Sequence, residues 1–310
     1  MKIITMTLNP AYDLHLSADS LRPGRDNSAR MTRRDAGGKG VNLSRALLSF
    51  GVESIPYLLV GEESARDFTE ELLRDGLSPI YDTVPGRVRE NINIHADEDT
   101  VISTDGTPIT ASDMLCASAH VLPLVDSETY LVFSGSIPKG SDKTAIFALL
   151  SEACRRGAKL ILDSRSLTLK ETLDLSPFLI KPNLGEAEAL LGKKLTGIRE
   201  AASAACSLYK MANGRIANIL LTAGSEGAVL VTESGVYRAL TPRIEAVSSV
   251  GAGDSTVAGF LIALGEGRDD PERLRLATAF GTAACLAEGS RPPEKEKIRE
   301  MYEKVEIVSE

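Results

Sequence analysis

The sequence predicts an α/β fold with a mostly parallel sheet covered by helices on both faces. The chain has 310 residues, enough for one large domain or for a large domain with a smaller insert. In its second half, continuous apolar runs alternate with helical patterns of roughly 10–15 residues, which is typical of parallel sheets. A different pattern at 88–105 predicts a hairpin with one wet face, which would pair with residues 12–36 in a small separate sheet.

The composition is that of a soluble globular protein, with 43% hydrophobic and 25% charged residues. The net charge of -8 argues against general affinity for nucleic acid or anionic membranes, although a few local basic groups can still bind an anionic small molecule. Tryptophan is absent and aromatic residues make up 5%, so a surface that stacks single-stranded bases is not expected. The ligands should therefore be small molecules.

Cysteine usage and hydropathy indicate a reducing compartment. The cysteines lie far apart and lack metal-ligand spacing, so we expect reduced thiols. They are Cys116, Cys154, Cys206 and Cys285. The apolar run at 3–8 is too short for a signal peptide, and no run reaches the ~18 apolar residues of a membrane helix. We expect a cytoplasmic protein.

The elements of the N-terminal third follow from local patterns. A strand at 3–8 ends in an Asn-Pro turn. Apolar residues at helical spacing predict a helix at 41–50, which Gly51 ends. A buried strand is expected at 55–60 and a helix at 65–75.

Strands and helices alternate from residue 130 onward. Strands are expected at 130–134, 159–163, 178–181, 219–222 and 228–232, with helices at 143–156, 184–191 and 198–211. Three further helices are expected at 254–264, 271–288 and 293–305. Ligands of open parallel sheets bind at the carboxyl ends of strands. The chemistry is therefore expected in the strand-end loops 9–13, 134–140, 163–166, 181–186 and 222–227.

The strongest local motif is Gly251-Ala252-Gly253-Asp254, directly before an apolar helix. Glycines let backbone N–H groups approach a ligand closely, and free N–H groups at a helix N-terminus form an anion site. Asp254 in the first turn can simply cap the helix. Beside an anion site, a carboxylate can also orient and deprotonate a hydroxyl that accepts a phosphoryl group. The motif therefore favours phosphoryl transfer to a hydroxyl.

A second glycine cluster, at 37–40, precedes the predicted helix 41–50. It fits neither the GxxxxGK[ST] spacing of a Walker A loop nor the GxGxxG spacing of a dinucleotide site. It is either a flexible turn, or a loop whose backbone and Lys39 hold a polar ligand.

Three further sites each allow two interpretations. Asp13 is either a solvated turn residue or a ligand to sugar hydroxyls. Asn183 and Glu186 have a spacing that suits a helix capping box as well as a metal-nucleotide site. The segments 134–136 and 222–227 are either turns or ligand-contacting loops.

In this order, the motifs resemble the ribokinase-like, or PfkB, family of sugar kinases, over essentially the whole chain. The motifs are TLNPAYD at 7–13, GGKGVN at 37–42, SGSIPKG at 134–140, KPNLGE at 181–186 and GAGD at 251–254. The first two resemble the branch that acts on sugar phosphates, with 1-phosphofructokinase and tagatose-6-phosphate kinase. The resemblance implies a Rossmann-like three-layer α/β/α sandwich in a single domain, 1–310, with lid segments at about 12–36 and 88–110.

The same resemblance implies roles for individual residues. Asp254 would be the catalytic base, with an anion hole from Gly251, Ala252 and Gly253. The sugar and its phosphate would be bound by Asp13, Gly38, Lys39, Asn42, Arg89, Asn91 and Ser136. ATP would contact Lys181, Asn183, Glu186, Thr222, Gly224, Gly227, Ser249 and Val250. Glu186 would act on Mg²⁺ through water. A monovalent cation and a homodimer formed through the lid are also implied.

One position departs from the family pattern. The sugar-phosphate branch usually has a lysine where this chain has Asn93. An amide cannot supply the charge-assisted contact of a lysine to phosphate, worth about 1.5–3 kcal/mol. The phosphate would then be bound by Arg89, Lys39 and Lys139, unless it lies elsewhere or the substrate has none.

The predicted reaction is ATP-dependent phosphorylation of a sugar phosphate, with fructose 1-phosphate as the favoured substrate. Tagatose 6-phosphate, fructose 6-phosphate, and an unphosphorylated sugar or nucleoside are alternatives. A non-catalytic sugar-binding protein is a further class, which retention of Asp254 and the glycines disfavours. A nicotinamide dehydrogenase suits the α/β alternation but lacks the dinucleotide fingerprint.

Overall fold

The computed structural model describes residues 1–98 and 100–309. Within these residues, ten strands form a mixed sheet in the order β14-β13-β12-β11-β10-β9-β8-β1-β4-β5. The strands from β5 to β11 in this order run parallel to one another. At the other end of the sheet, β12, β13 and β14 each pair with the preceding strand in the antiparallel direction. The strands are β1 (Lys2–Thr7), β4 (Ile55–Gly61), β5 (Ile80–Val84), β8 (Thr129–Ser134), β9 (Lys159–Asp163), β10 (Leu179–Ile180), β11 (Asn218–Thr222), β12 (Ala228–Thr232), β13 (Gly235–Leu240) and β14 (Glu306–Ser309).

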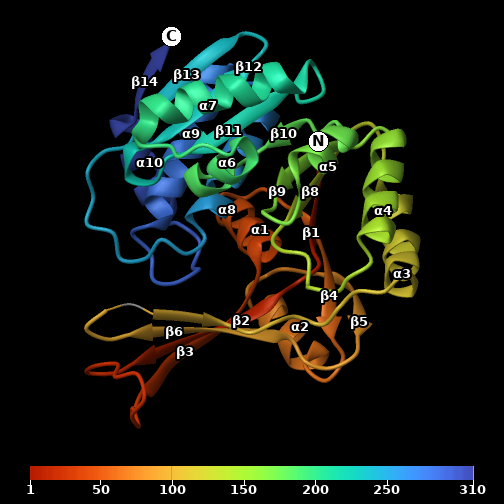
Figure 1. Ribbon diagram of the computed structural model, residues 1–310, viewed down its shortest axis with the longest axis vertical. Coiled ribbons are helices and arrows are strands. Elements are labelled where there is room, and N and C mark those ends of the chain that lie inside the picture. The colour runs from red at the N-terminus through yellow and green to blue at the C-terminus, as the bar shows by residue number, and fades with distance from the viewer. Residues whose placement is uncertain (99, 310) are drawn as a thin grey trace.

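Helices cover both faces of this sheet (Figure 1), which confirms the predicted α/β fold class. One face carries α3 (Ala111–Val121), α4 (Lys143–Arg155), α5 (Leu169–Leu175), α6 (Leu184–Leu191) and α7 (Gly197–Ala212). The other face carries α1 (Lys39–Ser49), α8 (Ala252–Gly265), α9 (Asp270–Ala284) and α10 (Lys295–Lys304). Helix α8 is apolar on nearly all sides, because it is packed among the sheet, α1 and α9. Two 3₁₀ turns are η1 (Leu122–Leu124) and η2 (Gly224–Glu226).

A small sheet extends from the lower end of the large domain in Figure 1. In the described part of the chain its strand order is β3-β2-β6-β7. These strands are β2 (Ala11–Ser17), β3 (Arg30–Gly37), β6 (Arg89–His95) and β7 (Thr100–Ser103). They occupy the two segments that the sequence assigns to a separate sheet. One face packs Tyr12 against Phe68 of α2 (Ala65–Arg74).

Arg33 connects the small sheet to the large domain. Its Nη2 donates a hydrogen bond to the carbonyl oxygen of Glu288 at 3.1 Å. Its Nε lies 2.6 Å from a carboxylate oxygen of Asp35 on the same strand. Glu288 follows α9, and the nearby Ser290 is adjacent to Gly251, the residue that precedes α8. The small sheet is thereby held over the N-terminus of α8.

The sequence missed the elements whose patterns are weakest. No strand was predicted for β5, β13 or β14, and no helix for α3 or α5. The strands β13 and β14 lie at one edge of the sheet with several half-exposed residues, so they lack the continuous apolar run of a central strand. Helix α8 begins at Ala252 rather than at the predicted 254, and α9 ends at Ala284 rather than at 288.

Candidate active site

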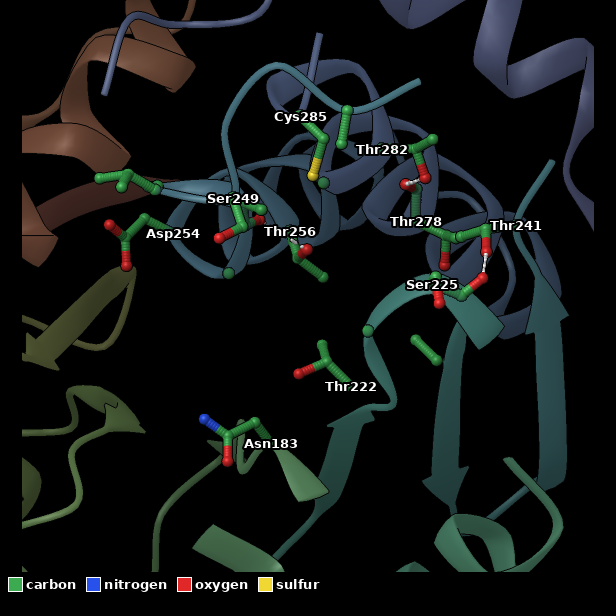
Figure 2. A pocket seen from close by; sticks show the side chains of 18 of the residues that line it. Asn183, Thr222, Ser225, Thr241, Ser249, Asp254, Thr256, Thr278, Thr282 and Cys285 are labelled. Atoms are coloured by element: carbon green, nitrogen blue, oxygen red, sulfur yellow. Dashed lines mark hydrogen bonds between the residues drawn. The ribbon is translucent and has the colours of Figure 1, made fainter. Parts of the chain in front are cut away.

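A cavity of about 1050 Å³ lies between the carboxyl ends of the strands, the small sheet and the helices α8 and α9. Figure 2 shows its walls, with Asp254 at one side and Thr241 and Ser225 at the other. Most of the residues singled out from the sequence line it: Asp13, Gly38, Lys39, Asn42, Arg89, Asn91, Lys181, Asn183, Thr222, Gly224, Gly227, Ser249, Val250, Gly251, Ala252, Gly253 and Asp254. Ser136 and Glu186 are not part of this lining.

The N-terminus of α8 presents free backbone donors to the cavity. Gly251 holds the N-cap position with φ 76°, a left-handed conformation that favours glycine, and no side chain caps the helix. Among the described residues, the N–H groups of Gly253 and Asp254 have no hydrogen-bond acceptor. Asp254 therefore does not serve as the cap that the sequence left open. The helix end offers an anion site beside a carboxylate.

The carboxylate of Asp254 is buried and lines the cavity. Its Oδ2 accepts a hydrogen bond from Nδ2 of Asn42 at 3.1 Å. Burial, and next the negative charge of Asp163, raise the pKa of Asp254 to about 7, although Lys39, the Asn42 hydrogen bond and Lys181 oppose the rise. A carboxyl group with a pKa near neutrality can exchange a proton with a substrate hydroxyl.

Asp163, at the end of β9, organises the charges beneath the site. Its Oδ1 lies 3.0 Å from Nζ of Lys39 and 3.3 Å from Nζ of Lys181. Burial raises its pKa, but these two ammonium groups outweigh burial and hold the pKa below its usual value. For Lys39, burial lowers the pKa, and the charges of Asp163 and Asp254 raise it further than burial lowers it. Lys39 therefore stays charged next to Asp254.

No role was predicted for Asp163. Its signal was weak: an acidic residue that ends a buried strand and opens one of the strand-end loops. Its partner Lys39 lies 124 positions earlier in the chain. Only the fold brings the three groups together.

The small sheet contributes a chain of polar side chains at the opposite wall. Asn91 Nδ2 donates to Asp13 Oδ1 at 2.8 Å, and Arg89 Nη1 donates to Asn91 Oδ1 at 2.7 Å. Arg89 also reaches the carbonyl oxygen of Asn9, whose side-chain Nδ2 donates to the hydroxyl of Ser136 at 2.9 Å. Burial raises the pKa of Asp13. The row offers carboxylate, amide and guanidinium groups to a polyol.

The glycine at position 38 is required by backbone geometry. Gly38 has φ 129°, and a Cβ there would lie 2.9 Å from Cγ2 of Thr7. This tight approach sets the start of α1, so that Lys39 and Asn42 both line the cavity. The cluster at 37–40 is therefore an ordered part of the cavity wall.

The side chain at position 93 contributes no charge to the site. Asn93 is buried, and its Nδ2 lies 3.4 Å from the carbonyl oxygens of Leu14 and Asn91. Arg89 lines the cavity and has no carboxylate partner among the residues described. A second guanidinium, that of Arg165, lines the neighbouring cavity of about 660 Å³. Burial lowers the pKa of Arg89 most, and the nearby positive charge of Arg165 also lowers it.

Asn183 and Glu186 form a capping box at the start of α6. Asn183 Oδ1 accepts from the N–H of Glu186 at 2.9 Å, and Glu186 Oε2 accepts from the N–H of Asn183 at 3.1 Å. Asn183 lines the main cavity, whereas both residues line a neighbouring cavity of about 660 Å³. In the structure the two residues therefore cap α6, and this capping box lies next to the main cavity.

A magnesium ion is compatible with these residues. Among the residues described, no three His, Cys, Asp or Glu side chains are grouped to hold a metal. Mg²⁺ keeps several waters and usually takes one or two carboxylates together with nucleotide phosphates, so a full protein cage is not required. Glu186 offers a carboxylate, and its charge helps raise the pKa of Lys39.

One face of α9 also lines the cavity and was missed. Thr278, Gly281, Thr282 and Cys285 recur at helical spacing on this face. That periodicity of small and polar residues within an apolar helix was a usable signal. The remaining lining residues without a predicted role are Ser225, Glu226, Ala228, Thr241, Pro242, Arg243, Ile244, Ala246 and Thr256.

Comparison with known proteins agrees with this geometry. The profile of the pfkB family carbohydrate kinases matches residues 6–297. The chain belongs to the pfkB family of carbohydrate kinases. A tagatose-6-phosphate kinase of Staphylococcus epidermidis is 31% identical over 309 residues, covering 99% of each chain. A 1-phosphofructokinase of Xanthomonas campestris is 32% identical, covering 97% of this chain and 96% of the relative.

Two solved structures share the fold of this chain. Phosphofructokinase-2 of Escherichia coli, in complex with potassium, has a TM-score of 0.90 at 25% identity and covers 98% of both chains. A possible 1-phosphofructokinase of Thermotoga maritima has a TM-score of 0.83 at 25% identity and covers 100% of both. The predicted family, fold and reaction class, phosphotransfer to an alcohol group, are confirmed. In the described residues no helix has the length and apolar character needed to cross a membrane.

Proposed function

We propose that this pfkB kinase transfers the γ-phosphoryl group of ATP to a primary hydroxyl of a ketohexose phosphate. The observation that carries the proposal is the buried carboxylate of Asp254 beside the free N–H groups at the start of α8. The carboxylate orients the hydroxyl and accepts its proton, while the N–H groups and the charged Lys39 and Lys181 stabilise the phosphoryl group in transfer. Gly253 and Asp254 would supply the free N–H groups of the anion hole, and the turn Gly251-Ala252-Gly253 would let the phosphoryl group approach them closely.

The sugar would bind between the small sheet and α1. Asp13, Gly38, Asn42 and Asn91 would hold its hydroxyls, with Lys39 on the side of Asp254. Arg89 would bind the phosphate at the other end, assisted by Arg165. The N–H of Ile137 donates a hydrogen bond to the hydroxyl oxygen of Ser166, next to Arg165, at 2.9 Å, so that loop lies beside Ser136. Asn93 has no part in this contact.

Fructose 1-phosphate is the proposed acceptor. It carries a phosphate at one end and a primary hydroxyl at the other. Tagatose 6-phosphate has the same two groups with the ends exchanged, and relatives of the chain at 31% identity are named tagatose-6-phosphate kinase. Tagatose 6-phosphate is the second candidate, because a site that binds a phosphate at one end and a primary hydroxyl at the other would accept either sugar phosphate.

The nucleotide would occupy the rest of the cavity. Lys181, Asn183, Thr222, Gly224, Gly227, Ser249 and Val250 would contact it, with Mg²⁺ held by the phosphates and by Glu186 through water. The bound ion would neutralise charge on the phosphates during transfer. A monovalent cation would support the activity, in line with the potassium complex of phosphofructokinase-2.

The small sheet would act as a lid on the single domain and as a dimer interface. Its outer face carries Met31 and Ile102, which are 56% and 51% exposed, next to Leu16 and Ile92. A row of exposed apolar side chains on a four-stranded sheet favours pairing with a second copy. A phosphofructokinase-2 of Escherichia coli has a tetrameric form, which shows that a protein of this fold assembles.

The experiment is a substrate panel read by ADP release. Wild type and Asp254→Asn are assayed with fructose 1-phosphate, tagatose 6-phosphate, fructose 6-phosphate, fructose and a nucleoside. We expect the highest kcat/KM for fructose 1-phosphate. A preference for the uncharged acceptors would overturn the phosphate assignment. No sugar-dependent ADP release with any acceptor would instead indicate a sugar-binding protein.

A further inference from the structure

Helix α1 carries a buried arginine one turn after Asn42. Arg45 is 8% exposed and is not part of the cavity lining. Its Nε and Nη2 donate to Oδ2 of Asp75, the C-cap of α2, at 2.9 and 2.6 Å. Nη2 also donates to the carbonyl oxygen of Ala36 in β3 at 2.5 Å. Two other elements therefore hold the guanidinium in place and pair its charge.

The remaining nitrogen of this guanidinium faces Asn42. Nη1 of Arg45 donates to Oδ1 of Asn42 at 3.4 Å, a long contact between residues three positions apart on one helix face. On the other side of the amide, Nδ2 of Asn42 donates to Oδ2 of Asp254 at 3.1 Å. The amide of Asn42, which is itself buried, thus lies between a donor and a carboxylate.

The chemistry of these two neighbours selects one orientation of the amide. A guanidinium has donors only, and an ionised carboxylate has acceptors only. In the observed orientation the amide oxygen faces Arg45 and the amide nitrogen faces Asp254, so both contacts are favourable. A flipped amide would place its NH₂ group against Arg45 and its oxygen against Asp254. That oxygen could accept a hydrogen bond only from the protonated carboxyl group, so the flipped amide favours the form that cannot act as a base.

We propose that Arg45 is a positioning residue, which holds the amide of Asn42 with Nδ2 toward Asp254 and thereby favours the ionised base. The proposal deepens the proposed function and rests on Asp254 being the base. Without the guanidinium, the amide can flip whenever Asp254 is protonated, and the protonated form then gains a hydrogen bond. Arg45 touches no reacting group and acts through Asn42.

The other charged groups around the base are independent of this contact. Burial raises the pKa of Asp254 most, Asp163 raises it further, and Lys39 and Lys181 lower it. Arg45 is not among the main charges that act on this pKa. Loss of the guanidinium should therefore act through the amide.

The experiment compares Arg45→Met, Arg45→Lys, Asn42→Ala and the double variant Asn42→Ala/Arg45→Met. Methionine keeps the length of the side chain without a donor, whereas lysine keeps a donor. Asp75→Asn is the matched control, since asparagine keeps an acceptor for Arg45 but removes the charge of the ion pair. One readout is the acid limb of kcat/KM. The other is the titration of the Asp254 carboxyl by carbon-13 NMR without substrate, assigned with Asp254→Asn.

We expect Arg45→Met to move the limb and the titration of Asp254 upward by about 0.5–1 pH unit, because the hydrogen bond that lowers this pKa is lost. Arg45→Lys should restore about half of the shift or more. In the Asn42→Ala background, Arg45→Met should cause no further shift. Asp75→Asn should stay within about 0.2 pH unit of wild type, although it loses thermal stability.

Circular dichroism checks that each variant is folded. If Arg45→Met does not fold, Arg45→Met with Asp75→Leu takes its place, because replacing both members of a buried ion pair by apolar groups is tolerated better than removing one. The expected shift is the same.

Three results would overturn the proposal. The first is an unchanged limb and titration in the folded variant without Arg45. The second is an undiminished shift in the Asn42→Ala background, which would assign the effect to the charge of Arg45. The third is an equal shift in Asp75→Asn. A protein that shows the expected NMR shifts but phosphorylates no sugar phosphate would refute the proposed function and leave the role of Arg45 standing.

Discussion

The acid side of the pH profile should report the ionisation of Asp254. The base must be unprotonated to accept a proton, and its pKa is about 7. From pH 8 to pH 6 the unprotonated fraction of such a group falls from about nine-tenths to about one-tenth, so kcat/KM should fall roughly tenfold. Activity is therefore retained above the pKa and lost below it.

Two substitutions should move this limb in opposite directions. The charge of Asp163 raises the pKa of Asp254, so Asp163→Asn should shift the limb to lower pH. The hydrogen bond from Asn42 lowers the pKa of Asp254, so Asn42→Ala should shift the limb to higher pH. Both variants will also lose activity, because both residues lie in the site. The readout is the position of the limb.

The assay is ADP release with subsaturating sugar phosphate from roughly pH 5.5 to pH 9, a range that spans the pKa of about 7 of Asp254. A sugar phosphate itself titrates with a pKa of about 6, but this is equal for all variants, so differences between them belong to the enzyme. Circular dichroism checks that each variant is folded. Limbs that coincide in all three proteins, or that move in the same direction, would refute the assignment of the limb to Asp254.

Two further predictions concern the phosphate end and the lid. Arg89→Ala and Arg165→Ala should each raise the KM for fructose 1-phosphate about 10- to 100-fold, because each removes one charge-assisted contact to the phosphate. The KM for fructose should change less. Equal effects on both sugars would contradict a phosphate contact. Met31→Lys with Ile102→Lys should convert a dimer to monomers in sedimentation. Val101→Lys, on the opposite face of the same strand and 62% exposed, should leave the dimer intact; a monomeric wild type would refute the interface.

The predictable part of the fold depended on local signals. Glycines before a helix, apolar runs and capping patterns are encoded within a few residues, so α1, α6 and the central strands β8 and β9 were found close to their observed bounds. The edge strands β13 and β14 were not, because an edge position is defined by neighbours that arrive from elsewhere in the chain.

The same distinction applies to the site. The chemistry of the motif around Asp254 could be predicted, because donors and carboxylate are adjacent in sequence. The role of Asp163 depends on two lysines brought to it by other elements. Position 93 drew attention as a substitution, yet its side chain is turned to backbone groups.

The most direct test of the central claim is the Asp254→Asn arm of the substrate panel. The variant removes the base and keeps the size and hydrogen-bonding capacity of the side chain. We expect ADP release with fructose 1-phosphate to fall by about 10²- to 10⁴-fold, while the Kd for ATP stays near the wild-type value. Near-normal turnover in Asp254→Asn would contradict the account.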